Sequence, residues 1–158
     1  MLLGKKRKLG RKIEDITVGE RLKLTEKIED KDLLLYLGLT NDGNPLYIQH
    51  DFASTTSFEK PVVPNIMLTG IVTSAVSKYI PGPGSYICEQ HLVFKKPVYH
   101  YATIDFLLEV ADVDVRNNQV TIRVEGKDEE GAIYIDGTIV AQPPKTINRL
   151  TTQAMENF

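Results

Sequence analysis

Asp42 carries a carboxylate, a group that can accept a proton or a hydrogen bond. It lies in the polar segment of residues 40–45, where Gly43 and Asn44 tolerate unusual backbone angles and Pro45 keeps its predecessor out of the helical region. We therefore expect a compact loop that presents the carboxylate. An Asp in such a turn also commonly accepts hydrogen bonds from backbone amides of its own loop, so a structural role remains open beside the catalytic one.

Four further side chains have reactive groups. His50, His91 and His100 can each take up a proton near neutral pH, although each also suits a surface or packing position, and His50 is the one that follows the Asp42 loop closely in the sequence. No group of residues has the spacing of metal ligands, and no glycine-rich phosphate motif is present, so we expect neither a metal nor a cofactor. Cys88 is the single cysteine and lies in a strand-like run, where we expect a small buried apolar side chain.

The elements that must position these residues follow from hydrophobic periodicity. Apolar residues recur at helical spacing over residues 67–79, and the polar residues between them are mostly small, which predicts a central helix covered by other structure. Short helices are expected near residues 33–37 and 49–55. Alternating segments predict strands, and the turns at residues 117–118 and 129–131 are typical of antiparallel hairpins. The predicted strands are residues 21–28, 86–94, 103–113, 119–126 and 132–142.

These elements predict an α+β fold in which a curved antiparallel sheet wraps around one helix. The length of 158 residues suits one domain with its own core, and 42% hydrophobic and 25% charged residues are typical of a soluble globular protein. No apolar run is long enough to span a membrane and none follows the basic N-terminus as in a signal peptide, so we expect a cytoplasmic protein. Residues 1–12 carry six basic side chains without interleaved aromatics, which we interpret as a solvated tail and not as a nucleic-acid site.

Three blocks of the sequence resemble the MaoC-like family, which includes the (R)-specific enoyl-CoA hydratases. Residues 40–47 resemble its hydratase motif, D-x-N-P-x-H preceded by Thr or Ser and one further residue. Residues 58–63 resemble its F-x-x-P-I-V block, and residues 81–98 resemble its L-P-G-x-G-S and Q-x-L-x-F-x-x-P-V stretch. The blocks follow the family's order and spacing. They predict a MaoC-like domain over residues 13–143, between a basic tail of residues 1–12 and a C-terminal tail of residues 144–158.

The resemblance implies a single hot-dog fold, with its antiparallel sheet wrapped around a central helix at about residues 67–79. It implies a dimer, either of identical chains or with a homologous hot-dog subunit, and an acyl-CoA or acyl-carrier-protein thioester bound in a tunnel at the subunit interface. An active member would be a lyase of fatty acid metabolism. In such an enzyme the motif's Asp and His share the water, and a backbone amide of an H-G pair holds the thioester carbonyl.

Carried onto this sequence, the resemblance assigns the candidate base to Asp42 and places Tyr47 at the position of the histidine. Asn65 stands at the glycine of the H-G pair, and Asn44 and Pro64 are expected to contact substrate. A phenol has an unperturbed pKa of about 10 and cannot take up a proton near neutral pH as an imidazole can. The two-residue mechanism of the family therefore cannot run unchanged.

Both substituted positions keep groups that could still contact a substrate. Tyr47 can donate a hydrogen bond to a water or a carbonyl, or it can fill the space of the imidazole by packing. Asn65 adds a side chain where glycine lets a ligand approach the backbone, but its amide N–H and carboxamide remain as donors.

The residues leave two functions open. The first is an enoyl-CoA hydratase or 3-hydroxyacyl dehydratase in which Asp42 is the base. The second is a catalytically silent hot-dog subunit, which either pairs with an active hydratase or binds acyl-CoA as a sensor. Retention of Asp42 with its loop favours the enzyme, whereas the changes at Tyr47 and Asn65 favour the silent subunit.

Overall fold

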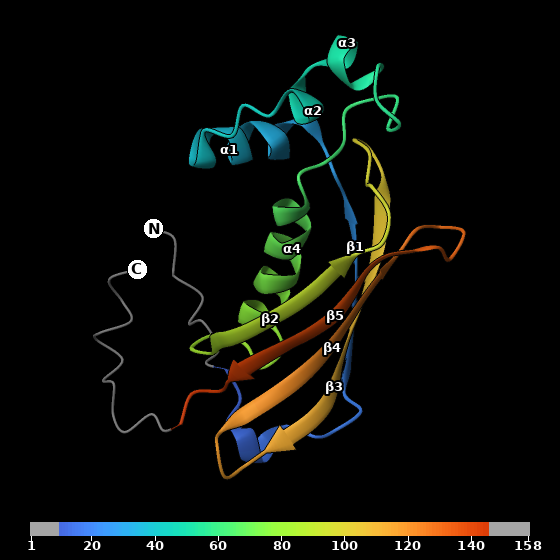
Figure 1. Ribbon diagram of the computed structural model, residues 1–158. Coiled ribbons are helices and arrows are strands. Elements are labelled where there is room, and N and C mark those ends of the chain that lie inside the picture. Colours follow the sequence, from blue (N-terminus) through green and yellow to red (C-terminus); the bar gives the residue numbers. More distant parts are fainter. Residues whose placement is uncertain (1–9, 146–158) are drawn as a thin grey trace, which may run out of the picture.

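The computed structural model describes residues 10–145, which form a five-stranded antiparallel sheet around one long helix (Figure 1). The strands lie in the order β1-β3-β4-β5-β2. This arrangement confirms the hot-dog fold expected from the sequence. The strands are β1 (Arg21–Lys27), β2 (Tyr86–Phe94), β3 (Thr103–Asp114), β4 (Gln119–Lys127) and β5 (Ile133–Gln142). The helices are η1 (Ile13–Asp15), α1 (Asp30–Thr40), α2 (Pro45–Ile48), α3 (His50–Ala53) and α4 (Asn65–Lys78).

Alternation of apolar and polar residues directs one face of the sheet toward α4. Along β3 every second residue from Ile104 to Val110 is buried, and β4 shows the same alternation. Burying a side chain of this size contributes roughly 1.5–3 kcal/mol, so these rows form the main source of the core's stability. The fully buried residues of the three central strands include Ile104, Phe106, Leu108, Val110, Val120, Ile122, Val124, Ile135, Ile139 and Ala141.

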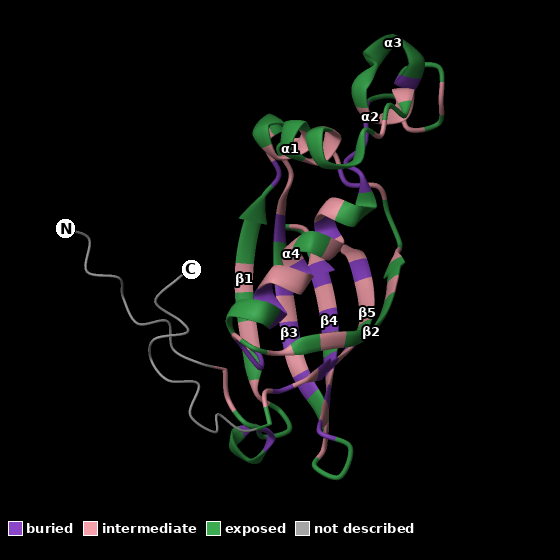
Figure 2. Cartoon of the chain, turned by 90° about the vertical axis from the view of Figure 1, so that its left-hand side faces the viewer, coloured by how far each residue is buried: buried purple, intermediate pink, exposed green. Residues whose placement is uncertain are grey.

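Helix α4 lies across the concave face of the sheet and buries one side against it (Figure 2). Leu68, Val72, Ala75 and Val76 face the core at helical spacing. The helix begins at Asn65, two residues before the predicted start. The opposite side is open: Tyr79, directly after the helix, is 57% exposed. The prediction of a covered helix is therefore correct for one side only.

Helices α1, α2 and α3 lie together at one end of the sheet and carry the loop that contains Asp42 (Figure 1). A capping box between Glu29 and Asp32 begins α1, and Asn41 ends it in the left-handed region at φ 54°. The helix extends well beyond the predicted residues 33–37. The short helix predicted over residues 49–55 is present as the single turn α3, and a further single turn, α2, precedes it with Pro45 at its first helical position.

The first described residues are fixed to the turn that follows α4. Gly10 donates its backbone N–H to the carbonyl oxygen of Pro83 at 2.8 Å, and Arg11 donates to that of Pro81 at 3.1 Å. The Arg11 guanidinium also pairs with Glu20 at 2.6 Å and lowers the pKa of that carboxyl. Residues 10 and 11 of the predicted basic tail therefore form backbone hydrogen bonds, while residues 1–9 of that tail and residues 146–158 of the predicted C-terminal tail lie outside the described residues.

Cys88 is exposed, which corrects the expectation of a buried thiol. The pairing of β2 with β5 shifts register between Ile87 and Glu89, and this bulge leaves Cys88 without a partner in the ladder. A bulge interrupts the alternation of faces that the prediction assumed. The thiol faces away from the core and donates to the carbonyl oxygen of Val140 at 3.3 Å.

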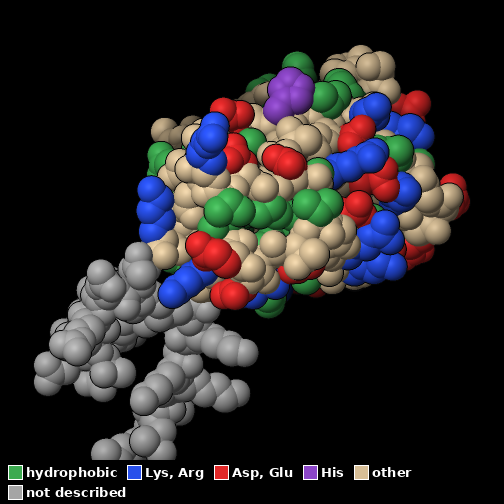
Figure 3. Space-filling view, turned by 90° about the horizontal axis from the view of Figure 1, so that it is seen from below, with side chains coloured by type: hydrophobic (Ala, Val, Ile, Leu, Met, Phe, Trp, Pro, Cys, Tyr) green, Lys and Arg blue, Asp and Glu red, His purple; other side chains and the backbone are tan. Residues whose placement is uncertain are grey.

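The surface carries charges of both signs. At the end of the molecule opposite α1, α2 and α3, basic and acidic side chains are interspersed (Figure 3), in keeping with a net charge of -2. Among residues 10–145, no helix has the length and hydropathy to cross a membrane.

Candidate active site

Asp42 lies in the loop between α1 and α2 and is half-buried. Its Oδ2 accepts a hydrogen bond from the Tyr36 hydroxyl at 2.6 Å, and its Oδ1 accepts one from the backbone N–H of Asn44 at 3.1 Å. Thr40 supports the same loop, since its hydroxyl donates to the carbonyl oxygen of Tyr36 at 2.8 Å. The carboxylate is thus oriented by two donors, and each of its oxygens keeps a further lone pair for a water molecule.

A pocket of about 290 Å³, which we call the motif pocket, opens beside this loop. It brings together two of the predicted site residues, Tyr47 from α2 and Asn65 from the start of α4. Asp42 is not among the residues that line it. The lining residues are Leu46, Tyr47, Phe58, Val62, Val63, Asn65, Phe94, Lys95, Lys96 and Pro97.

Backbone hydrogen bonds hold the walls of the motif pocket together. The N–H of Val62 donates to the carbonyl oxygen of Leu46 at 3.2 Å, and the N–H of Val63 donates to that of Val98 at 2.7 Å. The Tyr99 hydroxyl donates to the carbonyl oxygen of Phe58 at 2.9 Å. Three segments distant in sequence are therefore joined around one space, which explains how residues 58–63 and 94–98 reach the hydratase-like motif.

Two basic side chains line the motif pocket. Lys95 and Lys96 line it, and Lys95 lies 3.9 Å from a carboxylate oxygen of Asp136. The Lys60 ammonium lies 4.5 Å from the centre of the Tyr99 ring, a cation–π distance. This cationic surrounding suits a ligand whose distal part carries negative charge.

The two residues predicted to contact substrate have structural contacts of their own. The Asn44 side chain accepts a hydrogen bond from the N–H of Leu46 at 3.0 Å and so caps α2. Pro64 precedes the first residue of α4 and is buried. Asn65 is exposed, and its side chain does not cap the helix. Of these three residues, Asn65 is the one that lines the motif pocket.

The three histidines lie in different surroundings. His50 begins α3 and His91 lies on β2, and both are exposed. Both ring nitrogens of His100 are buried and have no hydrogen-bond partner among the described residues. Burial lowers the pKa of His100, the nearby Asp30 carboxylate raises it and His50 lowers it further. None of the three lines the motif pocket, and residues 10–145 contain no group of three His, Cys, Asp or Glu side chains placed to hold a metal ion.

Tyr36 is a site residue that the sequence reasoning missed. Its hydrogen bond to Asp42, together with desolvation, raises the pKa of the Tyr36 phenol, and Asp42 and Tyr47 add smaller electrostatic contributions. Tyr36 therefore keeps its proton and stays a donor to the carboxylate. The sequence contained one indication of this contact, because Tyr36 precedes Asp42 by six residues. A predicted helix that continued to Thr40 would have placed the Tyr36 phenol beside the loop.

Comparisons with known proteins identify the family of this chain. Residues 13–131 match the MaoC like domain family. An (R)-specific enoyl-CoA hydratase from Rhodospirillum rubrum is 29% identical over 131 residues, which cover 83% of this chain and 90% of the relative.

Solved structures show the same fold. The (R)-hydratase from Aeromonas caviae involved in PHA biosynthesis superposes with a TM-score of 0.78 at 27% identity, covering 83% of this chain and 99% of that one. A chain of the ChsH1-ChsH2 complex from Mycobacterium tuberculosis shares the fold at a TM-score of 0.72 and 23% identity, covering 81% of this chain and 98% of that one. The family match spans most of the sequence and includes the loop of Asp42, the motif pocket, α4 and strands β1 to β4, so this chain belongs to the MaoC-like domain family.

Proposed function

We propose that this protein binds an acyl thioester of coenzyme A or acyl carrier protein in the motif pocket, and that it hydrates enoyl thioesters or dehydrates 3-hydroxyacyl thioesters. The observation that carries the proposal is the motif pocket itself: Tyr47 and Asn65 bring polar groups to an otherwise largely apolar space beside the Asp42 loop. An apolar pocket with a few convergent polar groups is the usual form of a small-molecule site. The lysines around it suit the phosphates of either carrier.

The chemistry that these residues can support follows from their donors and acceptors. Hydration forms a bond between the water oxygen and the β-carbon, while the π electrons of the double bond take up a proton at the α-carbon. In the proposal, Asp42 accepts the proton of the attacking water and then gives that proton to the α-carbon, which returns the carboxylate to its starting state. The Tyr47 hydroxyl and the Asn65 amide donate toward the thioester oxygen, where negative charge builds. Tyr36 holds the carboxylate in place throughout.

The relatives favour a dimer for this chain. The sheet ends in two edges, and β2 is the longer of the two edge strands, with nine residues against seven in β1. A long unpaired edge is the part of a sheet most ready to pair with another chain. We propose that the protein is a homodimer or pairs with a homologous hot-dog subunit. Its mass in solution, measured by light scattering, distinguishes both from a monomer.

The experiment that tests the reaction follows the absorbance of the conjugated thioester of crotonyl-CoA. Wild type is expected to consume it, and Asp42→Asn is expected to reduce the rate by about 100-fold or more, the usual contribution of a positioned base. Asp51→Asn is the matched control, because Asp51 is an exposed aspartate nearby on α3. Equal activity of wild type and Asp42→Asn would exclude Asp42 as the base.

Tyr47→His tests the substituted motif position in the same assay. Restoring an imidazole adds a group that can take up and return a proton near neutral pH, so the hydration rate is expected to rise by about tenfold or more. Tyr47→Phe is the matched variant, because it keeps the ring and removes only the hydroxyl. A Tyr47→His rate no higher than wild type would show that the phenol is not what limits turnover.

A catalytically silent subunit is the second candidate function. Two observations favour it: Tyr47 stands where an imidazole would take up a proton, and Asp42 already accepts two hydrogen bonds and does not line the motif pocket. This candidate predicts no turnover of crotonyl-CoA, measurable binding of acyl-CoA, and a heterodimer when a homologous active subunit is added.

A further inference from the structure

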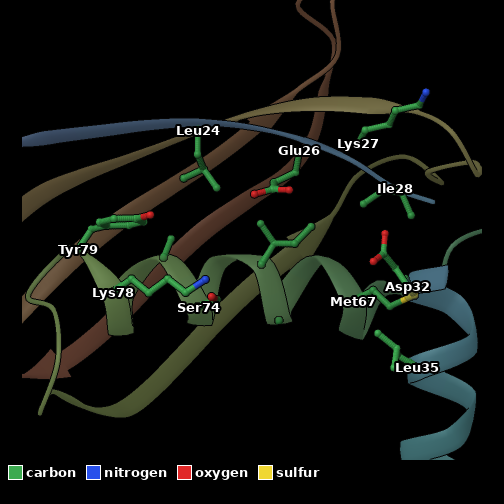
Figure 4. A pocket seen from close by; sticks show the side chains of 13 residues that line it. Leu24, Glu26, Lys27, Ile28, Asp32, Leu35, Met67, Ser74, Lys78 and Tyr79 are labelled. Atoms are coloured by element: carbon green, nitrogen blue, oxygen red, sulfur yellow. The ribbon is translucent and has the colours of Figure 1, made fainter. Parts of the chain in front are cut away.

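A second cavity, which we call the outer cavity, lies between β1, α1 and α4 (Figure 4). Its volume is about 390 Å³, larger than the motif pocket. The two spaces share no lining residue, so the outer cavity is a separate feature of the fold.

Apolar side chains from three elements form most of its wall. Leu24 comes from β1, Leu35 from α1, and Met67 and Ile71 from α4. Leu35 leaves 73% of its surface exposed. Covering such side chains with apolar matter is favourable in proportion to the area removed from water, so an aliphatic ligand would be stabilised here.

Gly70 keeps the outer cavity open along the backbone of α4. Glycine inside a helix is less favourable than alanine, because the unfolded chain gains more backbone freedom. A Cβ at Gly70 would meet no atom within 4 Å, so packing does not require glycine there. The missing side chain instead leaves space for a ligand to approach the helix closely.

The polar groups of the outer cavity carry opposite charges on facing walls. The Glu26 carboxylate projects from β1 toward α4, and Lys78 and Ser74 lie on α4 (Figure 4). Among residues 10–145, neither Glu26 nor Lys78 takes part in an ion pair.

The two other charged residues of the lining are directed elsewhere. Asp32 accepts a hydrogen bond from the N–H of Glu29 at 2.9 Å, and the Lys27 ammonium points away from the cavity (Figure 4). Glu26 would repel an anionic head group, and Lys78 would repel a cationic one. A hydroxyl donates to the first and accepts from the second, so an uncharged head fits both.

We propose that the outer cavity binds an unbranched aliphatic molecule of medium length with an uncharged hydroxyl head. The chain lies along Gly70 against Met67, Ile71 and Leu35, and the hydroxyl lies between Glu26 and Lys78. The volume falls in the lower part of the range for small-molecule sites, on the order of 300–1,000 Å³.

The test uses 1-octanol, octanoate and octylamine as probes of the full-length protein, followed by methyl NMR of its Ile, Leu, Val and Met residues. 1-Octanol is expected to shift the resonances of Leu24, Met67 and Ile71 saturably, and octanoate and octylamine to bind about tenfold more weakly. No saturable shift of these methyls, shifts confined to Leu46, Val62 and Val63 of the motif pocket, or equal affinity for the three probes would overturn the proposal.

Substitutions locate the chain and the head group. Gly70→Leu places a side chain in the cavity and is expected to weaken 1-octanol binding by about tenfold or more. Gly38→Leu is the matched control, because Gly38 also lies in a helix with open space around it but does not line the cavity. Glu26→Lys is expected to make octanoate the tightest of the three probes. Unchanged binding in Gly70→Leu, or an unchanged probe order in Glu26→Lys, contradicts the proposal.

Gly70→Ala provides an independent readout that needs no ligand. Because a Cβ there meets nothing, the variant is expected to melt at a higher temperature than wild type by circular dichroism. A lower melting temperature would mean that glycine is required by packing, and would remove the argument that it is kept for space.

Discussion

At the scale of single residues, the site centres on a carboxylate that one phenol holds in place. Tyr36 donates to Asp42, and Tyr47 stands where related motifs carry an imidazole. A phenol at neutral pH donates a hydrogen bond but does not take up a proton. In the proposed reaction, the proton that leaves water therefore passes to Asp42, and the rate would depend on the orientation of that one carboxylate.

Tyr36→Phe tests this orientation directly. Removing the hydroxyl frees the carboxylate to rotate, so kcat for crotonyl-CoA hydration is expected to fall about tenfold while KM stays within about twofold. If Tyr36 had a purely structural role, the variant would instead have a lower melting temperature, and kcat would not fall selectively while KM stayed constant. Tyr86→Phe is the control, because Tyr86 is an exposed tyrosine on β2. An unchanged kcat would show that the hydrogen bond does not orient the base.

The local part of the site could be predicted from the sequence and the tertiary part could not. The Asp42 loop depends on the backbone preferences of Gly43, Asn44 and Pro45, which act on their immediate neighbours. Which residues line the motif pocket depends on contacts between segments far apart in sequence, such as the hydrogen bond from Val63 to Val98. Periodicity carries no information about such contacts.

At the scale of elements, the strands followed their sequence pattern more closely than the short helices did. Strand β2 occupies the predicted residues 86–94, because alternation against a buried face is a strong local signal. Helix α1 is apolar on several faces and buries no residue completely, so its length could not be inferred from a stripe. The bulge at Cys88 was missed because a register shift depends on the partner strand, β5.

The pairing of β2 with β5 requires a residue without a side chain at position 137, where Gly137 stands. A Cβ at this position would lie 2.0 Å from the carbonyl oxygen of His91 on the neighbouring strand. Backbone atoms cannot move aside cheaply, so Gly137→Ala is expected to lower the free energy of unfolding by about 2–4 kcal/mol. Denaturant unfolding followed by circular dichroism measures the change.

Gly38→Ala is the matched comparison for Gly137→Ala. Gly38 lies within α1, and a Cβ there would meet no atom within 4 Å. The same substitution is therefore expected to raise the free energy of unfolding by about 0.5–1 kcal/mol. Effects of the same sign at Gly38 and Gly137 would contradict the steric explanation.

At the scale of the whole molecule, one half-buried histidine, whose two ring nitrogens are covered, links stability to pH. Burial lowers the pKa of His100, so the unfolded chain, with a histidine pKa of about 6.5, binds this proton more readily than the folded protein. Above about pH 6.5 both states are neutral and the stability is complete. As the pH falls below that value, the unfolded chain is protonated first and stability is lost, down to the pKa of the folded state.

His100→Gln is expected to reduce this acid sensitivity. Wild type should lose more free energy of unfolding than the variant between about pH 7.5 and about pH 5.5, because only wild type must keep an imidazole neutral in the fold. Urea unfolding at the two pH values measures both losses. His91→Gln is the control, since His91 is exposed. Equal losses in wild type and His100→Gln would rule out His100 as the source.

The exposed thiol on β2 makes the assembly of the molecule open to direct measurement. Cys88 is the single cysteine of the sequence, so a nitroxide spin label attached there marks one known point on an edge strand without any engineered substitution. If two copies pair through their β2 edges, the labels form one pair at a short, narrow distance in a dipolar electron resonance experiment. If the copies pair through β1 instead, the labels lie on the two outer edges of the joined sheets and are separated by the width of both sheets.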